Sequence, residues 1–274
     1  IGWDDPRMPT ISGMRRRGYP PQALKNFVNT AGISKRENVI DVSLLEFCVR
    51  EELNKTDPRV LAVVNPVKLI ITNYPDGQEE TLEAINNPED EAQGTRTIPF
   101  SKELFIERED FKEEANRKYF RLTLGKEVRL KNAYIIKGES VDKDADGNIT
   151  TIYCTYDPDS KSGSGTEASM RKVKGTIHWV SAAHAIDAEV RNYDRLFNDE
   201  APDQHKEKDF TDFINENSLS IQHAKVEPSL IDLPHENPVQ FQRLGYYILD
   251  ADSSKEKLVF NKTVGLRDNW TKKQ

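Results

Sequence analysis

The residues best suited to chemistry in this 274-residue chain lie in the stretch FKEEANRKYFRLTLGKEVRLKNAYIIK, at positions 111–137. Residues 112–137 carry eight Lys or Arg against three Glu, which leaves a local charge of +5, and Tyr119, Phe120 and Tyr134 stand among the cations. Single-stranded RNA is bound by stacking its bases on aromatic or Arg planes while cationic donors contact phosphates and base edges. The stretch predicts an RNA-binding surface; a solvated basic strand is the alternative interpretation.

The net charge of −7 argues at first against a nucleic-acid binder, but the charge is unevenly distributed. Residues 76–91 hold seven acids and no base, whereas residues 1–40 hold seven bases and three acids. A polyanion responds to charges within a Debye length of roughly 10 Å, so the local balance matters more than the sum. The acidic segment is interpreted as a solvated loop. The run Arg15-Arg16-Arg17 is a further candidate phosphate contact, although one arginine of such a run often packs internally.

Patterns typical of catalysis or metal binding are weak. The run DKDADGNIT at 142–150 imitates a calcium loop, but Tyr153 stands where the bidentate Glu belongs, and Asp-Gly favours a tight hairpin turn. Five scattered histidines and two cysteines provide no set of zinc ligands. No phosphate-binding glycine loop or nucleophile elbow is visible. The residues predict neither a catalytic site nor a metal site.

The elements that must position the basic stretch follow from composition and periodicity. With 36% hydrophobic and 31% charged residues, the chain suits small subdomains better than one thick-cored fold. Residues 19–32 and 41–55 have apolar residues at helical spacing, with Gly32 ending the first helix and Ser43 as the candidate N-cap of the second. From Arg59 onward, short runs rich in β-branched and aromatic residues alternate with turn residues, which is typical of barrels or sandwiches.

The sequence shows no pattern typical of a signal for export or membrane insertion. No apolar run approaches the roughly 18 residues that could span a bilayer, and no signal-peptide pattern opens the sequence. Two cysteines are too few for a disulfide scaffold and fit a reducing compartment. We expect a cytoplasmic protein without a membrane partner.

Several longer motifs carry a resemblance. The opening GWDDPRMPTISGMRRRGYPP is similar to the segment that follows the KMSKS-type ATP loop in class I glutamyl- and glutaminyl-tRNA synthetases. NPVKLIITNYP, REDFKEEANRKYFRLTLGKEVRLKNAYIIK, KGTIHWVSAAHA, VRNYDRLF, EPSL and NKTVGLRDNW then resemble the glutaminyl-tRNA synthetase family in order. The resemblance covers essentially all 274 residues.

This resemblance implies a mainly β fold of two anticodon-binding β-barrels, one inserted in the other, preceded by a small α-helical subdomain. The implied limits are 1–57 for the helical connecting subdomain, 58–178 plus 255–274 for the proximal barrel, and 179–254 for the distal barrel. The implied function is recognition of the glutamine tRNA anticodon. The nucleotide-binding fold would lie upstream of Ile1, so the chain is interpreted as a C-terminal fragment, inactive alone and without a cofactor of its own. The full-length enzyme attaches glutamine to tRNA with ATP and Mg. The implied partners are tRNA(Gln) and the upstream catalytic domain of the same polypeptide, and the protein is expected to be a monomer.

The resemblance also assigns roles to single residues. Arg59, Gln240 and Arg243 correspond to family residues at the central anticodon base, uracil; Arg121 corresponds to the arginine at the third base, and Arg129 to one near the first. A planar guanidinium suits such work because it can donate two hydrogen bonds to a base edge. Four further positions in the same motifs are also expected to bind the anticodon, although each departs from the residue familiar in the family: Lys118, Phe120, Lys131 and Asn269. The segment Ser34, Lys35 and Arg36 corresponds to one that touches the inside of the tRNA elbow.

Two alternatives remain open. A glutamate-specific synthetase has the same type of barrel, and Arg121 with its neighbours is the discriminating feature, because the two tRNA sets differ at the third anticodon base. The other alternative is a stand-alone RNA-binding β-barrel protein. The opening GWDDPRMPTISG disfavours it, because that segment belongs beside an ATP loop.

Overall fold

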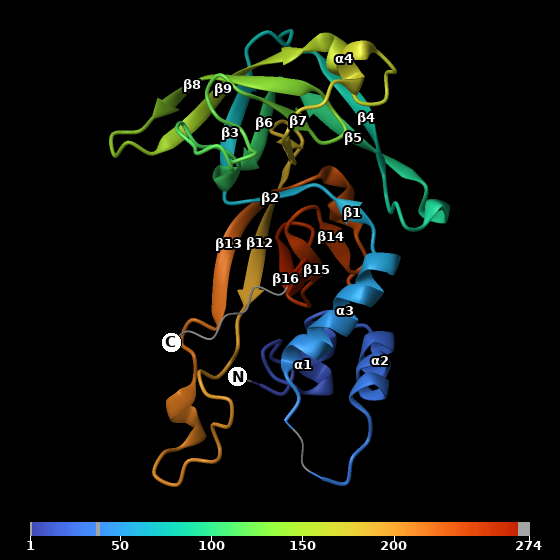
Figure 1. Cartoon of the computed structure of the whole chain (residues 1–274), viewed down its shortest axis with the longest axis vertical. Coiled ribbons are helices and arrows are strands. Elements are labelled where there is room, and N and C mark those ends of the chain that lie inside the picture. The colour runs from blue at the N-terminus through green and yellow to red at the C-terminus, as the bar shows by residue number, and fades with distance from the viewer. Residues whose placement is uncertain (1, 37–38, 268–274) are drawn as a thin grey trace. The chain divides into compact units, whose positions relative to one another are not determined.

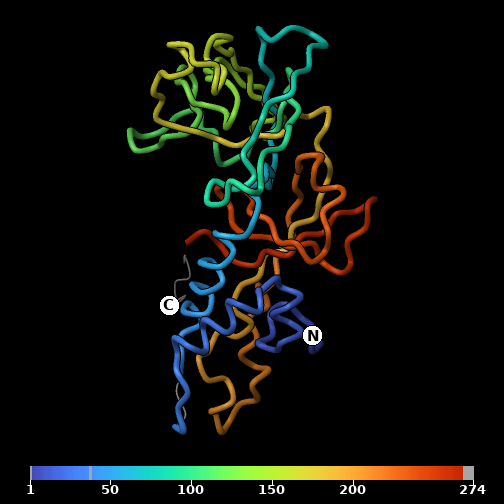
Figure 2. Tube along the Cα trace, turned by 90° about the vertical axis from the view of Figure 1, so that its right-hand side faces the viewer, coloured from blue at the N-terminus to red at the C-terminus, as the bar shows by residue number. Residues whose placement is uncertain are grey.

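The computed structural model describes residues 2–36 and 39–267. The chain forms two compact units. Unit 1 comprises Ile1–Arg59, Glu189–Gln222 and Asp232–Gln274, and unit 2 comprises Val60–Ala188 and His223–Ile231. The chain leaves unit 1 after the N-terminal helices, returns at Glu189 and re-enters unit 2 once more, a path that the colours in Figure 2 follow.

Unit 1 contains the main helices and five strands. The helices of unit 1 are α1 (Ile11–Arg16), α2 (Pro21–Ala31), α3 (Val42–Thr56) and the 3₁₀ helix η4 (Phe210–Phe213). Its strands follow the sheet order β14 (Val239–Phe241), β15 (Gly245–Leu249), β16 (Leu258–Gly265), β12 (Ile186–Tyr193) and β13 (Leu219–Val226). The first residues of β12 and the last residues of β13 belong to unit 2.

The two predicted long helices are confirmed (Figure 1). Pro21 opens α2, as its fixed φ favours, and Gly32 ends it with a φ of 76°. The predicted N-cap of α3 is wrong: Asp41 is the cap, and its carboxylate accepts a hydrogen bond from the backbone N–H of Ser43. Asp41 caps the helix instead of Ser43 because its carboxylate stands one residue before the first helical residue, where the unpaired N–H groups point.

The regular structure of the second unit is mainly β strands, joined by short helices and loops. One sheet has the strand order β10 (Thr176–Ile177), β7 (Glu127–Leu130), β8 (Ile135–Lys143), β9 (Ile149–Asp157), β3 (Pro66–Ile71), β6 (Glu103–Glu107) and β11 (Val180–Ser181). A separate hairpin pairs β4 (Glu79–Ile85) with β5 (Thr95–Ser101). Two short strands complete the first sheet, whose full order is β1-β14-β15-β16-β12-β13-β2. β1 (Arg59–Val60) begins on the last residue of the first stretch of unit 1, and β2 (Ala62–Val64) pairs with the part of β13 that belongs to unit 2. The short helices of unit 2 are α4 (Glu167–Met170), η1 (Glu91–Gln93), η2 (Arg108–Asp110), η3 (Pro158–Ser160) and η5 (Pro228–Asp232).

The predicted mainly β fold with a small helical region is confirmed, with the strands gathered in two seven-stranded sheets (Figure 1). The acidic segment 76–91 is not the loop that its composition suggested. Residues 79–85 of that segment form β4, in which Leu82 and Ala84 are buried while Glu79 and Glu83 are exposed. Alternation with period two hides the apolar positions among the acids.

The calcium-like run 142–150 is a hairpin turn, as predicted. It joins β8 to β9, and Gly147 takes a φ of 82°. The carboxylate of Asp144 accepts hydrogen bonds from the backbone N–H groups of Asp146 and Asn148. These bonds hold the turn, and in the described part of the chain no group of three or more His, Cys, Asp or Glu could hold a metal ion.

The core of unit 2 positions the basic stretch. Phe100 is fully buried and its ring lies 5.0 Å from that of Trp179 and 5.4 Å from that of Tyr134. In β7, Val128 and Leu130 point into this core while Arg129 points outward. The core therefore fixes the direction in which the cations of the neighbouring segments point.

Candidate nucleic-acid interface

The basic stretch surrounds a cavity of about 280 Å³ in unit 2. Its lining combines cations with aromatic rings: Arg117, Tyr119, Phe120, Arg121, Lys126, Glu127, Val128, Lys174 and Gly175. Glu127, the one acid of this lining, is paired with Arg171, which neutralises it. The cavity is therefore a cationic pocket with an aromatic wall, which suits a flat, electron-rich ring attached to phosphates.

Phe120 forms an exposed wall of this pocket. Its side chain is 51% exposed, and the ammonium group of Lys174 lies 5.7 Å from its ring centroid. A cation near the face of an aromatic ring is attracted by the ring electrons, so Lys174 and Phe120 form one side of the pocket together. The exposed part of the ring offers an apolar surface at the pocket wall.

Arg121 is held by an anchor that the sequence did not reveal. Its Nε lies 3.3 Å from Oδ1 of Asp110, a residue only 1% exposed, and its Nη1 donates to the carbonyl of Glu109 at 3.1 Å. The phenol of Tyr119 donates to that same carbonyl at 2.8 Å. Arg121 thus enters the pocket in a fixed direction, because a buried carboxylate holds its inner edge.

Gly175 permits the close approach of two segments of the pocket. A Cβ at this position would lie 2.3 Å from the carbonyl oxygen of Phe120 and 3.2 Å from Cγ1 of Val128. Any side chain there would push the Phe120 segment away from β7. The residue next to it, Lys174, was missed by the sequence reasoning, because it stands 53 positions after Arg121 in a run that shows no aromatic interleaving.

Arg129 does not share the environment of Arg121. Its Nη1 donates to the carbonyl of Ser160 at 3.1 Å and to Oγ of Ser162 at 3.2 Å, and its Nη2 donates to the carbonyl of Ser169 at 2.8 Å and to that of Arg171 at 3.3 Å. Burial, together with the neighbouring Arg171, lowers the pKa of Arg129. Arg129 therefore fastens the segment 160–171 in this structure, and both of its terminal nitrogens already donate to that segment.

Lys118 and Lys131 lie exposed beside these residues in unit 2. The backbone N–H of Lys118 donates to the side chain of Asn116 at 3.0 Å, which fixes the local turn. Lys131 does not continue β7, as the alternation in the sequence suggested; the strand ends at Leu130, and the turn that follows has Asn132 at a φ of 60°. A residue with positive φ cannot extend a strand, so the common face expected for Arg129 and Lys131 is not produced by strand geometry.

Three other predicted residues meet in unit 1, at the end of α3 and in the β14–β15 hairpin. Arg59 Nη2 donates to Oδ1 of Asn54 at 2.9 Å, and Asn54 Oδ1 also accepts from the phenol of Tyr246 at 3.3 Å. The same phenol accepts from Nε2 of Gln240 at 2.9 Å. The backbone N–H of Gln240 donates to the carbonyl of Pro58 at 2.9 Å. Arg59 and Gln240, 181 positions apart in sequence, therefore belong to one hydrogen-bonded cluster.

Arg243 stands at the tip of the same hairpin with an exposed side chain and a φ of 69°. A left-handed backbone is uncommon for a residue with a Cβ, and such residues concentrate at functional sites. The turn between Phe241 and Gly245 holds it there. The structure thus brings Arg59, Gln240 and Arg243 to one end of unit 1.

A buried acid adjoins this cluster. Asp57, the C-cap of α3, is 3% exposed, and its Oδ1 accepts from the hydroxyl of Thr56 at 2.9 Å, while its Oδ2 has no hydrogen-bond partner among the residues that the structure describes. Burial raises the pKa of Asp57 to about 7, against smaller opposing effects of Thr56 and Arg59. A carboxyl group two residues from Arg59 is therefore close to half-protonated at neutral pH.

The predicted elbow segment Ser34, Lys35 and Arg36 follows α2 and is exposed, with Ser34 Oγ accepting from the backbone N–H of Arg36 at 3.0 Å. Asn269, also predicted to bind the anticodon, lies outside the described residues.

The run Arg15-Arg16-Arg17 divides between surface and interior. Arg15 is exposed, whereas Arg16 is paired with Asp250 at 2.8 Å. Arg17 donates to the carbonyl of Thr263 at 3.2 Å. Packing thus uses two of the three arginines.

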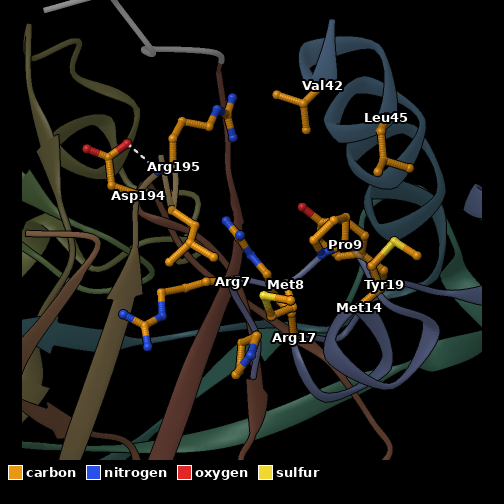
Figure 3. A pocket seen from close by; sticks show the side chains of 12 residues that line it. Arg7, Met8, Pro9, Met14, Arg17, Tyr19, Val42, Leu45, Asp194 and Arg195 are labelled. Carbon is orange, nitrogen blue, oxygen red and sulfur yellow. Dashed lines mark hydrogen bonds between the residues drawn. The ribbon is translucent and has the colours of Figure 1, made fainter. Parts of the chain in front are cut away.

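Arg17 also lines a second cavity of about 100 Å³, formed within unit 1 (Figure 3). Arg7 and Arg195 point into the same cavity, but Asp5 binds Arg7 at 2.7 Å and Glu46 binds Arg195 at 2.6 Å. Paired guanidinium groups of this kind stabilise the packing of unit 1 and are less available to phosphates than those of the unit 2 pocket.

Comparison with known protein families agrees with this geometry. Two models described as the anticodon-binding domain of class I tRNA synthetases (E and Q) match residues 58–157 and 176–250. A model of the catalytic domain of the same synthetases matches residues 1–55, the segment for which the sequence predicted a helical subdomain. The chain belongs to the class I tRNA synthetases of this E and Q family.

Individual relatives narrow the similarity further. The chain is 54% identical over 272 residues to the glutamine–tRNA ligase of Vibrio vulnificus, and 55% identical over 271 residues to that of Proteus mirabilis. It is also 54% identical over 272 residues to the glutamine–tRNA ligase of Rhodopirellula baltica. These alignments cover 99% of this chain but 48%, 48% and 45% of the three relatives, so the chain spans about half the length of the relatives it matches.

None of the helices in the described part of the chain is both long and apolar enough to cross a membrane.

Proposed function

We propose that this chain recognises the anticodon of tRNA(Gln) as part of a glutamine–tRNA ligase. The observation that carries the proposal is the cationic, aromatic-walled pocket of unit 2, which lies mostly within a segment that matches an anticodon-binding domain. Its volume of about 280 Å³ leaves room for one nucleobase. The name shared by the relatives favours glutamine over glutamate as the amino acid.

Within this proposal the roles of single residues follow the resemblance. Arg59, Gln240 and Arg243 meet the central base, Arg121 meets the third and Arg129 the first. Lys118, Phe120 and Lys131 contribute stacking or phosphate contacts, as does Asn269. Ser34, Lys35 and Arg36 touch the inside of the tRNA elbow. Base contacts of this kind discriminate by about 1–3 kcal/mol each.

The remaining features of the proposal concern the complete ligase. It would attach glutamine to tRNA with ATP and Mg, which the anticodon-binding segments do not hold, and it would act as a cytoplasmic monomer. The domain limits 1–57, 58–178 plus 255–274 and 179–254 are part of this proposal. The compact units of the structure group residues differently, since β16 lies in unit 1 with α1, α2 and α3.

A binding titration tests the proposal. The chain is titrated with a stem-loop RNA carrying the glutamine anticodon, beside one with an altered central base, over a series of salt concentrations. Arg59→Ala should cost about 1–3 kcal/mol of discrimination at the central base. Equal losses for both RNAs would reduce Arg59 to a phosphate contact. A wild-type chain that does not distinguish the RNAs would overturn anticodon recognition.

A further inference from the structure

A buried phenol joins the two residues assigned to the central base. We propose that Tyr246 and Asn54 form a relay that fixes which way the amide of Gln240 faces, and thereby makes the site select a base with an imino N–H donor, such as uracil. The inference rests on the proposed function, in which Arg59 and Gln240 meet the central anticodon base. Tyr246 and Asn54 act here as positioning residues, through the side chains that touch the base.

The relay is a chain of three hydrogen bonds within unit 1. It runs from Gln240 Nε2 to Tyr246 Oη (2.9 Å), from Tyr246 Oη to Asn54 Oδ1 (3.3 Å), and from Arg59 Nη2 to the same Oδ1 (2.9 Å). Gln240 and Tyr246 are directly paired across β14 and β15, and Asn54 stands in the last turn of α3. Four separate elements, α3, β1, β14 and β15, thus present the four side chains to one another.

The direction of every bond follows from the chemistry of arginine. A guanidinium group only donates, so Asn54 must turn its oxygen toward Arg59. That oxygen then accepts the proton of Tyr246, which leaves the phenol oxygen as an acceptor for Gln240. The amide of Gln240 must therefore place its NH₂ group toward Tyr246 and its Oε1 away from it. Burial raises the pKa of Tyr246, so the phenol keeps the proton that this order requires.

The orientation of Gln240 decides which base fits. Oε1 of Gln240 accepts no hydrogen bond from the described residues, although the whole residue is only 8% exposed. An acceptor held in this way matches the N3–H of uracil and repels the unprotonated N3 of cytosine, a base of almost the same size. A partly buried acceptor that the wrong base leaves unpaired rejects that base strongly.

The ring and the hydroxyl of Tyr246 have separate tasks. The ring packs in a core cluster with Tyr19, Val49, Leu53 and others, whereas the hydroxyl alone enters the relay. Tyr246→Phe therefore keeps the packing and removes the relay. Tyr19→Phe is a matched control, because Tyr19 lies in the same cluster and its hydroxyl takes no part in the relay.

The experiment measures the binding of the 274-residue chain to two stem-loop RNAs that carry uracil or cytosine at the centre of a glutamine anticodon. Without the hydroxyl the amide can turn over and present NH₂ to N3 of cytosine. We expect Tyr246→Phe to weaken the binding of the uracil RNA and to strengthen the binding of the cytosine RNA. The ratio of the two affinities should fall by roughly tenfold. Tyr19→Phe should leave that ratio unchanged.

A second pair of variants tests the relay without touching the core. Asn54→Ala removes the shared acceptor and should reduce the ratio as Tyr246→Phe does, while Asn54→Asp keeps an oxygen acceptor and should preserve it. If Tyr246→Phe and Asn54→Ala lower both affinities by the same factor, the relay is merely structural and the inference is overturned. A wild-type chain that binds the uracil and the cytosine RNA equally well overturns the proposed function instead.

Discussion

Arg121 and Asp110 form an ion pair in which the acid is buried and the base is half exposed, with 3.3 Å between Nε and Oδ1. The side chains are 42% and 1% exposed respectively. The carboxylate holds the inner edge of the guanidinium group, so the outer edge is presented to the pocket in one direction. Preorganisation of this kind reduces the entropy that a flexible arginine would lose on binding RNA.

Arg121→Ala should therefore reduce discrimination at the third anticodon base by about 1–3 kcal/mol. Asp110→Asn should produce a smaller loss in the same direction, because Arg121 remains but is no longer held. The measurement is a titration of stem-loop RNAs that differ only at that base. Lys137→Ala is the control, since Lys137 is paired with Glu139 and does not line the pocket. Equal losses with and without the cognate third base would contradict a base-reading role.

Phe120 should contribute by stacking, without reading a base. Phe120→Leu keeps an apolar side chain but loses the ring face, and we expect it to weaken RNA binding by about 1–3 kcal/mol, equally for all bases at the adjoining position. Phe120→Trp should preserve the affinity. A Phe120→Leu variant that binds as tightly as the wild type would show that the ring only covers the pocket wall.

Gly175→Ala should close the pocket by displacing its wall. The added Cβ would meet the carbonyl oxygen of Phe120 at 2.3 Å, so the segment that carries Phe120 must move. We expect loss of RNA affinity by at least about tenfold together with a lower midpoint of thermal unfolding. Gly163→Ala is the control, because Gly163 lies in the same unit but has open surroundings. It shows the effect of a glycine substitution on stability and RNA binding when the pocket wall is not displaced.

Arg129 is proposed to meet the first anticodon base, but in this structure its guanidinium group binds the segment 160–171. One variant distinguishes these two roles. The four hydrogen bonds of its guanidinium group go to the segment 160–171. Arg129→Lys cannot form them all, so we expect faster proteolysis within 160–171. If RNA affinity and first-base preference are unchanged, Arg129 only fastens that segment. If the segment 160–171 of the wild-type chain is cleaved faster with RNA bound than without RNA, the hydrogen bonds of Arg129 are released when the RNA binds.

Stability should depend on pH through Asp57. Its pKa is raised from 3.8 to about 7 in the folded chain, so the neutral form is favoured by folding. The corresponding stability is fully present below about pH 4 and is lost as pH rises through 7. Asp57→Asn should remove this loss, and its advantage in unfolding free energy should grow by on the order of 2 kcal/mol between pH 5 and pH 8. Denaturant unfolding at both values measures it, and a pH-independent difference contradicts the assignment.

The helices and the β-rich remainder were predictable because they depend on local patterns. Gly32 and Pro21 mark the ends of α2 by backbone preference alone, and the Asp-Gly turn before β9 is equally local. The N-cap of α3 was less predictable, because Asp41 and Ser43 are both residue types that favour this position and only the geometry of the first turn separates them.

The site could be predicted only in part, for a different reason. Arg59, Arg121 and Gln240 were named from motifs, but their partners are set by packing. Asn54 and Tyr246 are 192 positions apart, and neither local sequence predicts the hydrogen bond between them. The hydrogen bonds of Arg129 to the segment 160–171 likewise depend on the tertiary structure. A strand pattern predicts which face of the sheet a side chain lies on, but not which residues it contacts there.

The two compact units interrupt each other along the chain, and this has a consequence for synthesis on the ribosome. Most of unit 2 is one continuous run, Val60–Ala188, whereas unit 1 needs three separate stretches. Its sheet places β16, residues 258–265, between β15 and β12. The pocket around Arg121 can therefore form as soon as its own run has emerged, but the sheet at the Arg59 end of unit 1 must stay incomplete until β16 has emerged.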